Sequence, residues 1–332
     1  MFDNLDVKKY LKTHSILIFF FVMVIIGFLL TDKNLGFLVK DMSNLLIMTL
    51  LLSLALIMPI KAGMGFNFAI ITGCIAGQLG LIFAINAELT GMGLMIVTLL
   101  MTCLFTLLLG LLNGFILSKA DDHTMIASYF LGTASGIFYS FIVFGLLGTI
   151  IRVSPDLLFP DDQNIRSTLD IKNLFPGNYV LIMLVFAIAV MAIIHFTEKS
   201  NRLDQFISSK STTYIKTSAF TLSIFIAALG QIFYLMNSKY IIISYPNTGL
   251  WSMGALSIII GGGTYKKANL SHVLIGSILI VVYRVVTIPA LTAFFSNQVI
   301  NVIGNLITSL VLLSVFIHKD TSKNRLVEKE TS

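Results

Sequence analysis

The sequence predicts an all-α polytopic membrane protein with about ten transmembrane helices. Residues of the types AVILMFWYC make up 56% of the 332 positions and charged residues only 11%, whereas a soluble domain usually carries about 25% charge. Apolar stretches of roughly 20 residues, the length that crosses a bilayer, recur along the chain. This composition excludes a water-soluble enzyme, a nucleic-acid-binding domain and a disordered or fibrous protein.

The spans follow one another with short polar connections. Residues 15–31 come after three lysines, as in a signal peptide, but no cleavage pattern of small residues follows, so we interpret them as a retained first span. Residues 240–265 are apolar but broken by Pro246 and several glycines, which indicates a short eighth span. The other predicted spans are residues 42–60, 66–86, 90–118, 123–151, 173–197, 217–237, 270–291 and 299–318.

The orientation follows from the loop lysines and arginines, which are enriched on the cytoplasmic side of membrane proteins. With the N-terminus inside, 15 of the 22 Lys and Arg fall in cytoplasmic segments, and Arg284 lies within a span. The remaining six fall outside: Lys33, Lys40, Arg152, Arg166, Lys172 and Lys239. Both termini are therefore predicted to be cytoplasmic. The longest external loop is about 152–172, and residues 319–332 form a polar, disordered C-terminal tail.

Two glycine-rich segments, residues 63–80 and 249–263, each precede a long apolar span. With ten spans, residues 42–151 and 217–318 become two halves of opposite direction within a single transmembrane domain, 1–332. Paired, glycine-broken segments in inverted repeats point to a transport pathway. The other interpretation is that these glycines only allow helices to pack closely.

Four polar residues within the spans are candidates for a translocation pathway, because polar groups at membrane depth usually face the bundle interior or water. Asn67 and Gln78 lie in the first glycine-rich segment, and Gln231 lies in a later span. Each amide has the alternative of a plain hydrogen bond between helices. Arg284 either lines an external vestibule or extends its side chain to the outer headgroups.

Residues for catalysis or metal binding are not recognisable. The spans contain no Asp or Glu, and the sequence has no nucleotide-binding loop, HExxH or GxSxG pattern. We therefore expect no enzymatic activity of its own, no catalytic or metal site, no cofactor and no nucleic-acid partner.

The longest internal loop, about 198–216, combines an apolar stripe with charges. Leu203, Phe206 and Ile207 recur at helical spacing and Lys210 follows. A short helix here is predicted to couple the spans to a soluble partner. The alternative is a helix that lies among the lipid headgroups.

Residues 63–85 read GMGFNFAIITGCIAGQLGLIFAI, and residues 249–286 contain an IGG followed by a glycine-containing span. These two stretches resemble the permease subunits of bacterial ABC importers for simple sugars, nucleosides and branched-chain amino acids. Residues 63–85 look like the glycine-rich segment of that family before a long helix. Residues 249–286 are similar to its late pattern: Ile260, Gly261 and Gly262 match its IGG, and Gly276 matches a span glycine. The chain departs from the family at Asn67, where an Asp is usual.

The resemblance implies a type II importer fold and a passive pathway for a small polar solute, preferentially a sugar or nucleoside. It also implies three protein partners besides membrane lipid: an ABC ATP-binding subunit, a second permease that is identical or related, and an extracellular solute-binding lipoprotein. The expected location is the bacterial cytoplasmic membrane. The alternatives are a branched-chain amino acid permease of the same family and a stand-alone secondary transporter.

Overall fold

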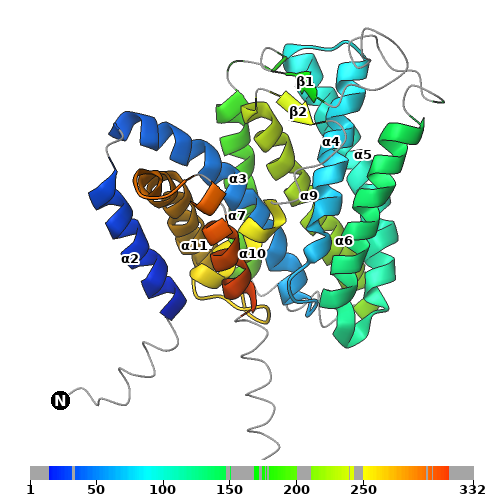
Figure 1. The fold of residues 1–332 in the computed structure, drawn as a ribbon. Helices are drawn as coiled ribbons and strands as arrows, with labels where there is room; N and C mark the ends of the chain where they lie inside the picture. The colour runs from blue at the N-terminus through cyan, green and yellow to red at the C-terminus, as the bar shows by residue number, and fades with distance from the viewer. Residues whose placement is uncertain are drawn as a thin grey trace, which may run out of the picture. The chain divides into compact units, whose positions relative to one another are not determined.

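Helices form nearly all of the described chain in the computed structural model (Figure 1). The structure describes residues 15–31, 34–146, 150, 168–171, 174–175, 177, 179–199, 211–238, 240–242, 250–296, 298–300 and 302–313. Within these residues, two short strands, β1 (Thr168–Asp170) and β2 (Tyr240–Ile242), pair antiparallel with Leu169 opposite Ile241. The predicted all-helical class is confirmed apart from this small pair.

The helices keep the order of the predicted spans. The α-helices are α2 (Ser15–Leu30), α3 (Leu35–Lys61), α4 (Ile71–Asn86), α5 (Gly91–Ser118), α6 (Thr124–Phe141), α7 (Tyr179–Lys199), α9 (Thr212–Asn237), α10 (Leu250–Ile260), α11 (Leu270–Val282) and α12 (Ile288–Ala290). The 3-10 turns are η1 (Phe68–Ile70), η2 (Asp121–His123) and η6 (Leu291–Ala293). Two π-helical segments, η3 (Ile142–Leu146) and η5 (Tyr283–Thr287), continue α6 and α11.

Seven helices in the described part are long and apolar enough to cross a membrane. They are Leu38–Lys61, Phe68–Asn86, Gly91–Ser118, Thr124–Leu146, Tyr179–Lys199, Thr212–Asn237 and Leu270–Ala293. The first and last predicted spans correspond to shorter apolar helices, Ser15–Leu30 and Gln298–Leu313, and the glycine-broken segment contains the 11-residue α10. By length and composition the protein is membrane-embedded, while the count of ten spans stays a prediction.

The chain forms two compact units. Unit 1 consists of Met1–Leu46 and Ala255–Ser332, and unit 2 consists of Ile47–Gly254, so that the division falls within α3 and α10. The predicted halves 42–151 and 217–318 are not tested by this division and stay a prediction.

In unit 2, helices α4, α5 and α9 pack against one another and form the core. α4 is buried on all sides, and its apolar residues pack with Leu94 of α5, Tyr139 of α6 and Leu235 of α9. In unit 1, Phe20 and Val24 of α2 pack against Val281 and Tyr283 near the end of α11.

Helix α5 is polar inside and apolar outside. Leu100, Leu108 and Leu112 are 65%, 59% and 60% exposed. The opposite stripe is buried and consists of Thr98, Thr102, Thr106, Gly110 and Asn113. A helix in water has the reverse arrangement, so the surroundings of the exposed leucines are expected to be lipid. The polar stripe avoids lipid because unpaired polar groups are costly in hydrocarbon.

Candidate functional site

The turn between α3 and α4 places Asn67 inside unit 2. The amides of Gly63 and Met64 donate to the carbonyls of Ile60 (3.1 Å) and Pro59 (2.9 Å), and Gly63 has φ +76°. This left-handed glycine cap ends α3 in the usual way. Gly65, with φ +74°, then redirects the chain toward Asn67, which is 2% exposed.

Asn67 connects two helices of the core. Its Oδ1 accepts from the amide of Ala69 (3.0 Å), which caps η1, and its Nδ2 donates to the hydroxyl of Ser223 on α9 (3.2 Å). The amide of Phe68 donates to Ser128 on α6 (3.0 Å). Asn67 is thus both a structural cap and a polar group between η1 and α9.

Half-way along α4, Gln78 joins two further helices. Its Nε2 donates to the hydroxyl of Tyr139 on α6 (2.8 Å), and its Oε1 accepts from Nε2 of Gln231 on α9 (3.3 Å). All three side chains are buried. Among the described residues, Oε1 of Gln231 accepts no hydrogen bond although it is inaccessible to solvent. A buried acceptor without a donor is costly, so it calls for an explanation beyond packing.

Helix α6 lines this region with hydroxyl groups on one face. Ser128, Gly132, Ser135 and Tyr139 recur at intervals of four, three and four residues, which places them along one side of a helix. Ser135 accepts from Thr72 of α4 (3.3 Å) and from Asn113 of α5 (3.4 Å). The result is a series of amide and hydroxyl groups that we call the polar seam: Asn67, Thr72, Gln78, Asn113, Ser128, Ser135, Tyr139, Ser223 and Gln231.

The glycines of residues 63–80 hold the seam helices close together. A Cβ atom on Gly77 would lie 2.8 Å from the carbonyl oxygen of Ala228, and one on Gly73 would lie 2.9 Å from Cβ of Ala227. A Cβ on Gly80 would similarly meet the backbone of α5 at Thr98 and Thr102. These three glycines therefore serve close helix packing, the second of the two interpretations of this segment.

Arg284 lies in unit 1, within the π-helical segment η5. Its side chain is exposed on the chain surface. In the same segment, Thr287 donates to the carbonyl of Met23 on α2 (2.9 Å), where Gly27 leaves room for it. Arg284 is not part of the polar seam of unit 2, and its predicted place on a pathway stays a prediction.

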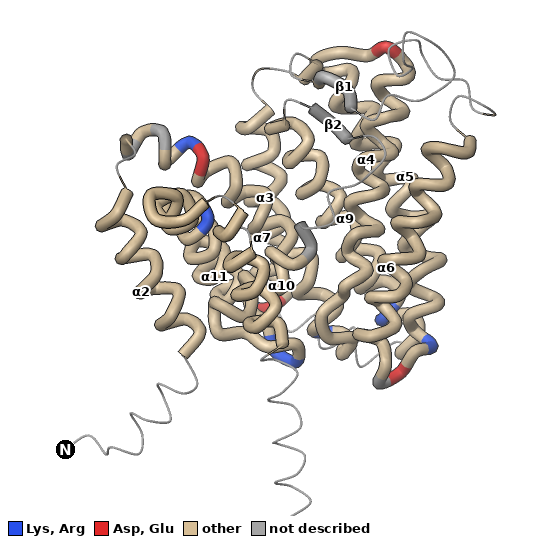
Figure 2. The backbone as a smooth tube through the Cα atoms, in the orientation of Figure 1, with Lys and Arg blue, Asp and Glu red and all other residues tan. Residues whose placement is uncertain are grey.

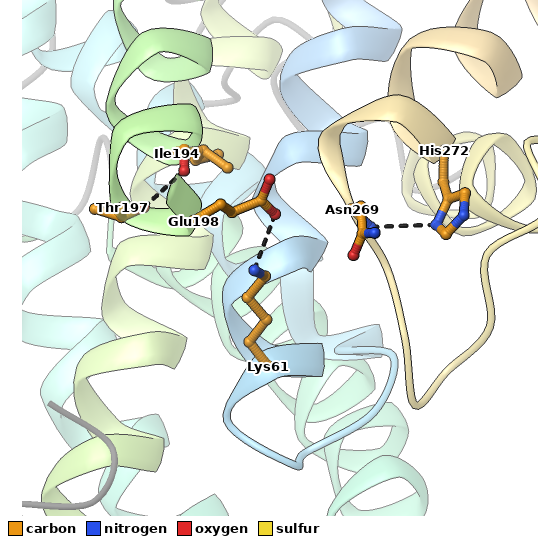
Figure 3. A network of polar contacts seen from close by, with 6 residues as sticks. All are labelled: Lys61, Ile194, Thr197, Glu198, Asn269 and His272. Carbon is orange, nitrogen blue, oxygen red and sulfur yellow. Dashed lines mark hydrogen bonds and ion pairs between the residues drawn. The ribbon is translucent and has the colours of Figure 1, made fainter. Parts of the chain in front are cut away.

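The described basic residues of unit 2 gather at one end of its helices. Lys61, Lys119 and Lys199 lie at the ends of α3, α5 and α7, and Lys216 lies in the second turn of α9, which runs the other way. Glu88 lies at the opposite end, between α4 and α5, so the described Lys and Glu residues of unit 2 lie near the ends of its helices (Figure 2). At the basic end, Nζ of Lys61 pairs with Oε1 of Glu198 at 2.9 Å (Figure 3).

The remaining predicted residues are not placed. Leu203, Phe206, Ile207 and Lys210 lie outside the described residues, and the coupling helix stays a prediction. Among the described residues, no group of three His, Cys, Asp or Glu is placed to hold a metal ion. Cys74 and Cys103 are free thiols.

Sequence reasoning missed the α6 contribution to the seam. Tyr139, Ser128 and Ser135 are ordinary residues of an apolar span when each is taken alone. The sequence did carry one signal of this role, because their spacing with Gly132 places all four residues on one face of a helix. Comparison with known protein families, with characterised proteins and with solved structures found no match.

Proposed function

We propose that this protein is the membrane-spanning permease subunit of an ATP-driven ABC importer that carries a small polar solute across the bacterial cytoplasmic membrane. The observation that carries the proposal is the polar seam of unit 2, with the unpartnered Oε1 of Gln231 at its centre. Polar groups at membrane depth are costly and, where they face the bundle interior, often line substrate pathways. The resemblance of residues 63–85 and 249–286 to importer permeases supports the same class.

In this proposal Asn67, Gln78 and Gln231 contact the solute during translocation, while Arg284, in unit 1, stays a separate pathway prediction. The described part of the seam contains only amides and hydroxyls. Such groups can both donate to and accept from the hydroxyl groups of a sugar or nucleoside. A free amino acid carries an ammonium and a carboxylate, which favour charged partners, so the branched-chain amino acid alternative is second.

The proposed partners are an ATP-binding subunit, a second permease and an external solute-binding lipoprotein. We assign the basic end of unit 2 to the cytoplasm, because lysines are enriched on that side of membrane proteins, and we propose that both termini are cytoplasmic as well. A stand-alone secondary transporter is the competing function. It usually needs an ion-coupling carboxylate, and the sequence has none within the predicted spans.

The direct test is purification of the tagged chain from its native membrane, followed by reconstitution. We expect an ATP-binding subunit to co-purify, and uptake into vesicles to require ATP. Uptake that follows an ion gradient without ATP would instead establish the secondary transporter.

The variant Gln231→Met then tests the seam itself. It removes the unpartnered oxygen at similar volume, but it also removes the Nε2 donor to Gln78, so we expect a loss of at most about 1–3 kcal/mol in unfolding free energy while uptake falls. Asn67→Leu and Gln78→Leu are expected to impair uptake with the protein still in the membrane. Unchanged uptake in all three variants would leave these residues with a packing role only.

A further inference from the structure

The turn that carries Asn67 is tied to unit 2 at both of its ends. At its start, Lys61, the last residue of α3, pairs with Glu198 near the end of α7, with Nζ and Oε1 2.9 Å apart. At its end, Asn67 donates to Ser223 of α9 at 3.2 Å. Between these ties, Gly63 and Gly65 adopt φ angles of +76° and +74°.

The position of Glu198 is unusual for an acidic residue. It lies in the last turn of α7, where the helix dipole disfavours negative charge. Lys61 lies in the last turn of α3, where positive charge is favoured. Both side chains are partly buried, with exposures of 24% for Lys61 and 20% for Glu198. The ion pair with Lys61 therefore explains the position of Glu198 better than its own helix does (Figure 3).

The turn is also held by packing, because Met64 and Phe66 are buried, with exposures of 3% and 1%. The amides of Gly63 and Met64 are bonded to the last carbonyls of α3. Asn67 in turn caps η1 through the amide of Ala69. Only five residues, two of which are glycines, separate Lys61 from Asn67 along the chain.

We infer that Lys61 and Glu198 are positioning residues: their ion pair fixes the turn 62–66 against α7 and thereby holds Asn67 in hydrogen-bonding position to Ser223 and Ala69. A movement of the end of α7 is transmitted to the polar seam through this pair. The effect on transport rests on the proposed function, whereas the effect of the ion pair on the position of Asn67 does not.

The test is amide hydrogen exchange of the full-length protein in lipid nanodiscs, for Lys61→Glu, Glu198→Lys and the double charge swap. In each single variant we expect faster exchange at Gly63, Met64 and Ala69, by up to about fivefold as for a partly exposed ion pair. Amides in the middle of α4 should keep their rates. The charge swap should restore the original rates, which a merely local disturbance of packing would not do.

Lys119→Glu is the matched control, because Lys119 also lies at a helix end on the basic side. It contacts the ring of Phe115, with Nζ 4.3 Å from the centroid, instead of a carboxylate. It makes the same change in loop charge and should leave the turn unaffected. If a charge reversal prevents membrane insertion, Lys61→Met and Glu198→Gln carry the same expectation of faster exchange.

Unchanged exchange in the single variants, or failure of the swap to restore it, overturns the inference. Uptake of labelled ribose and uridine by cells is measured in parallel and should fall in the single variants and recover in the swap. Altered exchange with unaltered uptake overturns the link to transport. If the original protein takes up neither probe, the proposed solute class fails, and the exchange rates still decide the role of the ion pair.

Discussion

Gln231 donates a hydrogen bond to Gln78 across 153 positions of sequence, and Gln78 donates in turn to Tyr139. The three side chains come from α9, α4 and α6, so a single buried connection joins three helices of unit 2. In a low-dielectric interior such linked hydrogen bonds strengthen one another.

Removal of the Tyr139 hydroxyl should destabilise the protein. Tyr139→Phe leaves Nε2 of Gln78 without this acceptor in a buried position, so we expect a loss of about 1–3 kcal/mol in unfolding free energy. The double variant with Gln78→Met removes both partners and should cost less than the sum of the single changes. Denaturation of the four proteins of this cycle in detergent measures the coupling; additive losses would show that the two residues act independently.

Close packing between α4 and α9 should make Gly77 sensitive to one added methyl group. Gly77→Ala places Cβ 2.8 Å from the carbonyl oxygen of Ala228, and we expect a loss of about 1–3 kcal/mol from overpacking. Gly136→Ala, in helix α6, is the matched control, because nothing lies within 4 Å of its Cβ. That control should be neutral or stabilising by up to about 1 kcal/mol. Equal melting temperatures for the two variants would contradict the packing role.

The topology is testable with single cysteines in a background that lacks Cys74 and Cys103. Glu88 and Lys119 lie at opposite ends of α5. A cysteine at Glu88 should react with an impermeant thiol reagent in intact cells, and one at Lys119 should react only after permeabilisation. The same logic predicts labelling at Asp161 and none at Ser208. The reverse pattern would invert the assigned orientation.

The loop 198–216 is predicted to dock the ATP-binding subunit through its apolar stripe. Replacement of Phe206 and Ile207 by Asp should release that subunit from the purified complex, because charged groups do not fit an apolar groove. Insertion in the membrane should persist, since the spans are unchanged. A complex that stays intact and hydrolyses ATP during uptake would favour the headgroup-bound alternative.

The sequence predicted the helices better than the site. Long apolar stretches define spans by length alone, which is why α3 to α7, α9 and α11 correspond to predicted segments. Asn67, Gln78 and Gln231 were identifiable singly, because amides are rare at membrane depth. The contact between Gln78 and Gln231 was not identifiable, because it depends on how α4 and α9 pack, and two glycines on α4 determine that approach.

The hydroxyl face of α6 is a second feature that could not be predicted from the sequence. Serine and tyrosine are common in membrane helices, and a serine hydroxyl can bond to its own helix as Ser128 does to the carbonyl of Met125 (2.7 Å). Only the partners on neighbouring helices distinguish Ser128 and Ser135 from such residues. The two π-helical segments were likewise not predicted, since the sequences IVFGL and YRVVT carry no glycine or proline pattern specific to that geometry.

The long sequence separation between Gln78 and Gln231 has a consequence for biosynthesis. At a synthesis rate of about 5–20 residues per second, the ribosome needs roughly 8–30 s to proceed from one glutamine to the other. During that interval α4 has left the ribosome with its central amide lacking the partner from α9, and Asn67 lacks Ser223. Tyr139 of α6, only 61 positions after Gln78, is available long before Gln231, so the α4–α6 bond of this connection can form first.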